Sequence, residues 1–296
     1  KLRNAFIALW GAQERVRITN EIHMRRKQVT DLIRLRYKAG REHKGSLLTA
    51  EAKEAEAKLE TEEAERDMRL KSRALCVAMG WDDYRLVCVS EPMNIAALSD
   101  WASADSAQGF QKFVVSTLSV QQLEIQRKIA GLRTLAARGE HSPDVTLRGS
   151  VSRSSSDWPP DDDSWSAGVS LSIPLFSGGS VVNGVKKARN AEERAEANLR
   201  SGINDSALSL HGKWNDVKNA VDYVEVMRKY LVASRERAKI SEAEYSNGYL
   251  SFDSWIIIED EFIRFEKSLL SATMSALSAE AGWIHAIGGT LENENE

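Results

Sequence analysis

Apolar residues recur at alternating steps of three and four along two long stretches of the chain, and nearly so along a third. This spacing is typical of a narrow seam on a helix that packs against a partner helix, as in a coiled coil. A core-facing stripe in an ordinary helical bundle gives the same pattern at any single site, but several long seams in one chain favour extended coiled-coil packing. The three seams are Leu2, Ala5, Leu9, Ala12 and Val16; Leu210, Trp214, Val217, Val221, Val224 and Leu231; and Trp255, Ile258, Phe262, Phe265, Leu269, Ala272, Ala276, Ala279, Trp283 and Ala286.

The five prolines divide the chain, because all of them lie between residues 92 and 174. Proline breaks helix interiors, since it lacks an amide donor and its ring clashes with the preceding turn. We therefore expect long helices over residues 1–40 and 180–248, each antiparallel to a shorter helix that follows a glycine turn. A helix over 180–248 would span roughly 100 Å, although Gly184, Gly202 and Gly212 inside it weaken this prediction.

The two helical regions resemble each other at an offset of 208 residues (245 − 37). The segment Arg36-Tyr37-Lys38-Ala39-Gly40 is similar to Glu244-Tyr245-Ser246-Asn247-Gly248, and no gap is needed across the alignment. We predict two copies of one helical hairpin, over about residues 1–80 and 209–288. Glycine at Gly40 and Gly248 suits a left-handed helix cap. Chance similarity between low-complexity helices is the alternative. The same offset also maps Leu2 onto Leu210, Ser46 onto Ser254, Glu51 onto Glu259 and Gly80 onto Gly288.

Residues 144–176 change to a period of two, which predicts two β-strands joined by a polar loop. Each run is about ten to twelve residues long, the length of a tilted membrane-spanning strand. On the strands alone, a soluble hairpin with one buried face is the favoured alternative. In lipid, open strand edges are not tolerated, so the hairpin would need strands from elsewhere, and this predicts an oligomer. The apolar positions are Val145, Leu147, Gly149, Val151, Trp165, Ala167, Val169, Leu171, Ile173 and Leu175.

Composition narrows the classes of function. With 42% hydrophobic and 28% charged residues, the chain is too apolar for disorder and too charged for a bundle of membrane helices. A net charge of −3 argues against a nucleic-acid binder, which needs a basic face. The five histidines have no metal-ligand spacing and no phosphate-binding loop is present. We therefore predict no catalytic site, no metal and no cofactor, and a protein that is not an enzyme.

Two further features are ambiguous. Cys76 and Cys88 do not establish a disulfide, and Cys76 is expected to pack as a small hydrophobic residue. Lys1 opens within a helical pattern and no signal peptide is visible, so we expect a longer protein of which this chain is a part.

The order of these features resembles the TolC-like outer-membrane efflux protein family. The segment Ile173-Pro174-Leu175-Phe176-Ser177-Gly178-Gly179 is similar to that family's signature after its last barrel strand, and the paired Tyr-x-x-Gly turns also match. The resemblance implies a mainly α fold, with long antiparallel coiled-coil hairpins that form an α-barrel. It also implies that the β-hairpin contributes to a trimeric outer-membrane β-barrel. The family's first helices and first strand pair would be missing.

The resemblance implies a division of the chain into six regions. These are a first periplasmic helical hairpin at 1–80, an equatorial region at 81–108, a helix leading to the barrel at 109–143, an outer-membrane strand pair at 144–176, a second periplasmic hairpin at 177–289, and a C-terminal tail at 290–296.

The implied function is a channel, the passive exit duct of a tripartite efflux or type I secretion system. It would lie in the outer membrane of a Gram-negative bacterium, with a large periplasmic portion. The implied partners are two more copies in a homotrimer, a periplasmic adaptor (membrane fusion) protein, an inner-membrane pump or ABC transporter, and outer-membrane lipid, with no nucleic acid.

Two sets of residues carry the implied site. The periplasmic gate and adaptor tip would comprise Tyr37, Gly40, Ser46, Tyr245, Gly248, Asp253 and Ser254, and the barrel exit motif Pro174, Leu175, Phe176, Gly178 and Gly179. Some members carry acidic rings past the second turn. Here Asp253 is the only acid between Phe252 and Ile257, one residue out of register, and a helix N-cap at Asp253 is the alternative.

A function of another class remains open, that of a soluble coiled-coil scaffold or interaction protein with a β-hairpin insert. The exported substrate also remains open: a drug, a metal, a protein or a polysaccharide. Pore-facing serine, threonine and glycine would carry little selectivity.

Overall fold

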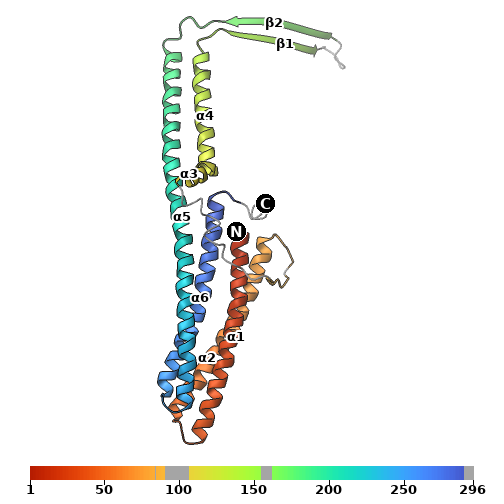
Figure 1. The fold of residues 1–296 in the computed structure, drawn as a ribbon. Helices are drawn as coiled ribbons and strands as arrows, with labels where there is room; N and C mark the ends of the chain where they lie inside the picture. Colours follow the sequence, from red (N-terminus) through yellow and green to blue (C-terminus); the bar gives the residue numbers. More distant parts are fainter. Residues whose placement is uncertain (84, 91–106, 155–161, 290–296) are drawn as a thin grey trace. The chain divides into compact units, whose positions relative to one another are not determined.

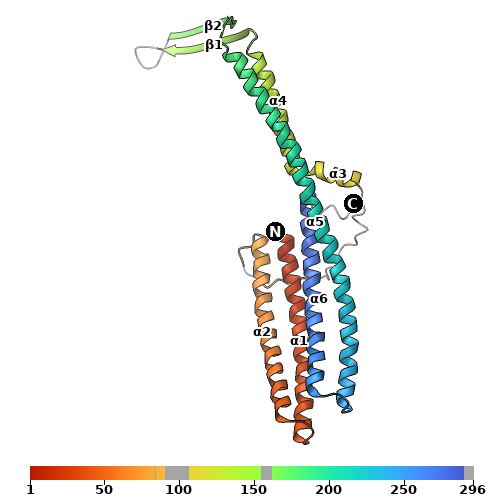
Figure 2. The same ribbon diagram turned by 90° about the vertical axis from the view of Figure 1, so that its left-hand side faces the viewer.

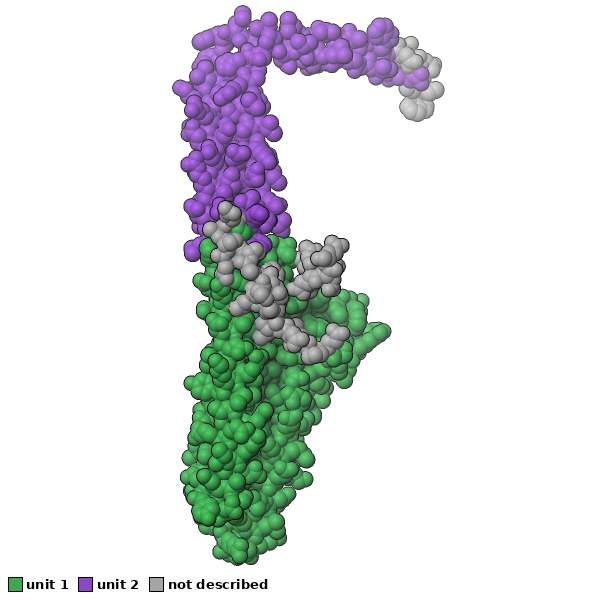
Figure 3. Space-filling model, in the orientation of Figure 1, with its two compact units in different colours: residues 1–110, 209–296 green, residues 111–208 purple. Residues whose placement is uncertain are grey.

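The computed structural model describes residues 1–83, 85–90, 107–154 and 162–289 (Figure 1). The positions of Pro92, Trp101 and Trp158 and the tail 290–296 lie outside these residues. The chain forms two compact units, Lys1–Phe110 with Ser209–Glu296, and Gln111–Leu208 (Figure 3). The region 177–289, expected as one hairpin, is therefore shared between both units.

The first unit is built from long antiparallel helices. Helix α1 (Leu2–Lys38) pairs with α2 (Lys44–Ala78), and the C-terminal part of α5 (Ser180–Ser246) pairs with α6 (Phe252–Ala286) (Figure 2). Helix α1 also contacts α6, so the two hairpins pack against each other. The long helices expected at 1–40 and 180–248 are confirmed.

The internal repeat is confirmed by the helix boundaries. Helix α1 ends at Lys38 and α5 at Ser246, while α2 spans Lys44–Ala78 and α6 spans Phe252–Ala286, 35 residues each. Each of these boundaries moves by 208 residues between the copies (38 to 246, 44 to 252, 78 to 286). The two hairpins are therefore the same structural unit.

Both hairpins turn at a glycine in the left-handed region, with φ of 69° at Gly40 and 82° at Gly248. The turns share their backbone hydrogen bonds as well. The Arg41 amide donates to the Arg36 carbonyl at 2.9 Å, and the Tyr249 amide donates to the Glu244 carbonyl at 2.9 Å. These bonds close the end of each helix as in a Schellman motif, so the expected left-handed caps are present.

Gly248→Ala should destabilise the protein by about 1–2 kcal/mol, because a Cβ is strained at this positive φ. Gly212→Ala is the matched control. Gly212 lies inside α5 with open space where a Cβ would stand, so alanine there should stabilise by about 0.5–1 kcal/mol. Urea unfolding of both variants measures the two signs, and a stabilised Gly248→Ala protein would contradict the assigned turn.

The predicted seam on α6 is buried in part, and a second buried stripe lies beside it. Trp255, Phe262, Ala272, Ala276 and Trp283 of the predicted seam are buried. The pattern missed the second stripe because α6 packs against more than one helix. Its Ile263 clusters with α1 and α2, whereas Ala272 and Ala276 cluster with α5. The second stripe consists of Ile256, Ile263, Leu277 and Ile284.

The second unit contains α3, α4 and the N-terminal part of α5. The single helix expected over 109–143 is wrong, because α3 (Ala107–Ser116) and α4 (Leu118–Gly139) are separate helices. Thr117 between them has extended backbone (ψ 137°), and its hydroxyl donates to the Val114 carbonyl at 2.7 Å. Helix α5 itself runs unbroken through Gly202. A Cβ there would collide with Cδ1 of Leu123, so this glycine makes room for α4.

Strands β1 (Asp144–Ser154) and β2 (Asp162–Ser172) form an antiparallel hairpin in the second unit. Strand β2 ends before Ile173 and Leu175, which were expected to extend it. The reason is Pro174, which has no amide donor and restricts the backbone of the residue before it. The register places the apolar residues opposite one another, with Val145 facing Leu171, Leu147 facing Val169, and Val151 facing Trp165.

No helix among the described residues carries an apolar run long enough to cross a membrane.

Candidate functional site at the helical turns

The turn ends of the two hairpins meet around Tyr245 in the last turn of α5. Its side chain is only 2% exposed. The ring stacks on Trp255 of α6 with a centroid distance of 4.5 Å, and the guanidinium carbon of Arg36 lies over the ring, 4.4 Å from its centroid. Tyr245 thus belongs to one hydrophobic cluster drawn from α1, α2, α5 and α6, whose other buried members are Ile33, Ala50, Phe252, Trp255 and Ile256.

The Tyr245 hydroxyl links this cluster to the α1–α2 turn. It donates a hydrogen bond of 2.8 Å to Oε2 of Glu42, and the Ser46 hydroxyl donates to Oε1 of the same carboxylate at 2.9 Å. Burial acts to raise the pKa of Glu42, but the hydrogen bonds from Tyr245, Ser46 and the His43 amide bring it below its usual range. Burial and the Glu42 hydrogen bond raise the pKa of Tyr245 to about 12. At neutral pH the pair is therefore a phenol that donates to a carboxylate.

Arg36 joins the same two turns through the backbone. Its guanidinium donates to the carbonyl oxygens of Tyr245 at 3.1 Å and Ser246 at 2.7 Å. These are among the last carbonyls of α5, which have no partner within the helix. A cation at this end also interacts favourably with the helix dipole. Arg36 therefore fixes the end of the second hairpin to the first.

Sequence reasoning missed Arg36 and Glu42 as site residues. A usable signal was present, because the repeat maps Arg36 onto Glu244 and Glu42 onto Leu250. The charge at position 36 is therefore reversed in the second copy, and the charge at position 42 is lost. A charge that departs from an otherwise matching repeat indicates a contact that the two copies do not share.

The residues expected at the tip differ in their burial and in their contacts. Tyr245 and Ser46 are buried and joined through Glu42, whereas Tyr37, the repeat counterpart of Tyr245, is 39% exposed. Ser254 lies in the first turn of α6, and its amide donates to the Ser251 hydroxyl.

The N-cap of α6 is Ser251, so an N-cap at Asp253 is wrong. Asp253 is exposed and lies inside the first turn, where the positive end of the helix dipole favours a carboxylate.

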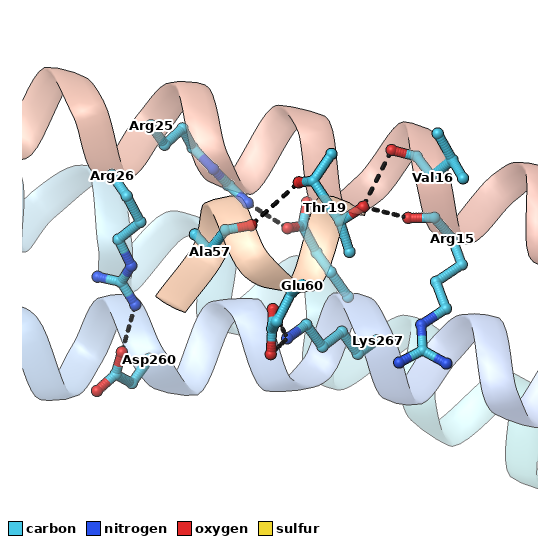
Figure 4. Close-up of polar contacts among 11 residues, drawn as sticks. Arg15, Val16, Thr19, Arg25, Arg26, Ala57, Glu60, Asp260 and Lys267 are labelled. Atoms are coloured by element: carbon cyan, nitrogen blue, oxygen red, sulfur yellow. Dashed lines mark hydrogen bonds and ion pairs between the residues drawn. The ribbon is translucent and has the colours of Figure 1, made fainter. Parts of the chain in front are cut away.

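A row of ion pairs connects the two hairpins farther along the helices (Figure 4). Asp260 of α6 accepts from Arg26 of α1 and from Lys53 of α2, the latter at 2.8 Å. Seven residues along both helices, Lys267 of α6 pairs with Glu60 of α2 at 2.6 Å. Seven residues is two helical turns, so the pairs lie on the same faces of α2 and α6.

Glu259 is a buried acid beside this row. Burial raises its pKa, Arg25 and Arg26 act in the opposite direction, and Glu242 and Glu266 raise it further. In the first hairpin the equivalent position is Glu51, which pairs with Arg34 at 3.2 Å. The repeat maps Arg34 onto Glu242. The acid Glu51 therefore has a positive neighbour in the first copy, whereas the equivalent acid Glu259 has a negative neighbour in the second.

Glu259→Gln should therefore stabilise the protein at neutral pH. A carboxyl whose pKa is raised by folding favours the folded state below its unfolded pKa, and this contribution is lost as the pH rises through the folded pKa. The gain in thermal midpoint should shrink as the pH falls toward the usual glutamate range, where Glu259 itself takes up a proton.

Glu51→Gln is the matched control for Glu259→Gln and should give no gain at neutral pH, because Glu51 has Arg34 as a partner. Thermal unfolding from pH 4 to pH 8 tests both variants. A Glu259→Gln protein that is less stable than wild type at pH 7 would show that Arg25 and Arg26 require the charge.

The expected barrel exit motif forms the connection between β2 and α5. Pro174, Leu175 and Phe176 lie here, and the last two side chains are exposed. Gly178 and Gly179 have positive φ of 59° and 83°, so the chain turns sharply just before α5 begins at Ser180.

The contacts around Tyr245 and along the ion-pair row hold helices together. Within the described part of the chain, no three His, Cys, Asp or Glu side chains gather as metal ligands would. Cys76 is buried, as expected, and its thiol donates to the Arg85 carbonyl at 3.4 Å.

Comparison with known proteins finds similarity to one family and to several solved structures. Residues 111–252 match the sequence profile described as outer membrane efflux protein. The central part of the chain is therefore similar to outer membrane efflux proteins. The matched region includes the strand pair, all of α5 and the turn after Tyr245. A comparison with curated protein sequences finds no match.

Solved outer-membrane proteins share the fold of this chain. Similar structures include VceC of Vibrio cholerae (16% identity, TM-score 0.73), the MtrE outer membrane channel of Neisseria gonorrhoeae in its open state (17%, 0.74), and the CmeC outer membrane channel of Campylobacter jejuni (15%, 0.70). The matches cover 97%, 100% and 99% of this chain, respectively, and 69%, 66% and 62% of the solved chains. The expected fold class is therefore confirmed, and the chain spans about two thirds of the length of these structures.

Proposed function

We propose that this chain is part of a homotrimeric exit duct through which substrates pass passively across the outer membrane. The observation that carries the proposal is the surface of the strand pair, which lies in the family-matched region. Its register gathers large apolar side chains on one face, where they are exposed: Leu147, Val151, Trp165, Val169 and Leu171. A contiguous apolar face of this kind marks a surface that another apolar phase covers, and here we assign lipid to it.

The trimer follows from the edges of the hairpin. Two strands leave unpaired amides and carbonyls on both outer edges, and lipid offers these groups no hydrogen bonds. Strands of further protomers would close the sheet and leave the serine-rich face toward water.

The helical turns around Tyr245 form the gate and adaptor tip in this proposal. The contacts of Tyr245 with Glu42 and of Arg36 with the end of α5 hold the two hairpin ends together. Parting these ends would open the duct, and a periplasmic adaptor that bridges to an inner-membrane pump is the partner we assign to the tip.

A pair of lysine substitutions in the full-length protein tests the lipid assignment. Val169→Lys places a charge on the apolar face and should cost about 2–4 kcal/mol near the middle of a bilayer. Ser170→Lys, the next residue, lies on the polar face and should be tolerated. We expect the first variant alone to lose outer-membrane assembly and efflux. Equal tolerance of both, with the protein recovered free of membrane, would favour the soluble scaffold instead.

A further inference from the structure

We propose that Arg148 makes the duct prefer anionic solutes, because it places a positive charge at the middle of the pore-facing surface of each strand pair. This inference rests on the proposed function, and it names the class of cargo that the channel favours.

The register assigns Arg148 to the polar face. Apolar residues occupy the odd positions of β1 from Val145 to Val151, and the even positions carry Thr146, Arg148, Ser150 and Ser152. The facing positions of β2 from 164 to 170 are Ser164, Ser166, Gly168 and Ser170. In this central block of the described strands, Arg148 is the one charged residue, and its side chain is exposed.

No acid stands opposite Arg148. Its direct partner across the strands is Gly168, and its diagonal neighbours are Ser166 and Ser170. Gly168 has open space where a Cβ would lie, so the facing strand leaves room above it. An arginine opposite a glycine, without a carboxylate in reach, keeps its full charge toward the solvent.

The neighbouring hydroxyls are engaged with each other. Ser150 and Ser166 are hydrogen-bonded across the strands at 2.9 Å, and Ser152 and Ser164 at 2.7 Å. The Thr146 hydroxyl donates to Asp144 at 3.2 Å. The two serine pairs give a neutral polar surface beside Arg148, so the guanidinium is the dominant electrostatic feature there.

The nearest acid on the same face is Asp144 at the start of β1. It lies four residues away, about 13 Å along a strand, which exceeds the screening length of about 8 Å at physiological salt. The two charges therefore act at separate levels. In a symmetric oligomer, each level becomes a ring of identical charges, and rings of arginine favour anions in pores.

Bilayer recording on the full-length protein tests the proposal through the chloride-to-potassium permeability ratio, from reversal potentials in a KCl gradient at about 150 mM, where the screening length is about 8 Å. Arg148→Glu should lower this ratio by about twofold or more. Arg153→Gln, which removes an arginine of the same strand from the opposite face, should leave it unchanged.

The outcomes separate this inference from the proposed function. A wild-type protein without any conductance would overturn the channel itself. If the wild type conducts and Arg148→Glu has the same permeability ratio, the role of Arg148 is overturned but the proposed channel is not. A lowered ratio in Arg148→Glu, together with an unchanged Arg153→Gln, supports it.

Discussion

Tyr245→Phe in the full-length channel should open the duct more often than in wild type. The substitution keeps the ring on Trp255 and under Arg36 but removes the donor to Glu42. Loss of this hydrogen bond costs roughly 1 kcal/mol per protomer. With the three protomers proposed above and a concerted gate, the shift is about 3 kcal/mol, a factor on the order of one hundred in the open-to-closed ratio. Single-channel recording measures this ratio directly.

Tyr37→Phe is the matched control for Tyr245→Phe, because Tyr37 holds the equivalent place in the first hairpin but is exposed. It should change the open probability much less. Glu42→Gln removes the acceptor charge from the same bond, and its effect should not add to that of Tyr245→Phe. Equal effects of the two tyrosine variants, or no effect of either, would leave Tyr245 with a packing role only.

Asp260→Leu should lower the free energy of unfolding by more than the loss of an exposed charge does, because Asp260 joins the two hairpins. Asp260 is the carboxylate shared by Arg26 and Lys53, and the Arg26 side chain is only 7% exposed. Removal of Asp260 leaves the buried Arg26 without its ion-pair partner, which costs about 3–5 kcal/mol for a fully buried pair. Because the Asp260 side chain is 41% exposed, we expect about 2–3 kcal/mol. Urea unfolding measures it.

A second substitution distinguishes the buried charge from general damage to α6. Arg26→Met in the Asp260→Leu background removes the uncompensated cation and should restore much of the stability, since apolar residues replace buried ion pairs well. Asp31→Leu, at an exposed pair with Arg34, should cost less than about 0.5 kcal/mol. A double variant as unstable as Asp260→Leu alone would assign the loss to packing.

Sequence patterns predicted the helices, turns and strands well where each depends on residues close together in the chain. Steps of three and four indicated the long helices, the offset of 208 residues indicated two equal hairpins, and Gly40 and Gly248 marked their turns. These signals depend on backbone conformation and on one buried face, both of which a short stretch of chain defines. The strands followed for the same reason, up to the Pro174 that ends β2.

The contacts between hairpins needed the tertiary structure. Tyr245 and Tyr37 occupy the same place in the repeat, yet one is buried against Glu42 and the other is exposed. Residues over 200 positions apart meet there, and no periodicity within either helix specifies which charge faces which.

The fit of Leu123 over Gly202 has the same origin, because the packing of α4 against α5 decided it. The sequence by itself determined two copies of one hairpin and a two-faced strand pair, since hydrophobic period and turn glycines act over a few residues. Only the tertiary structure decided which side chains join the copies, because burial and pairing at that interface depend on how separate helices pack.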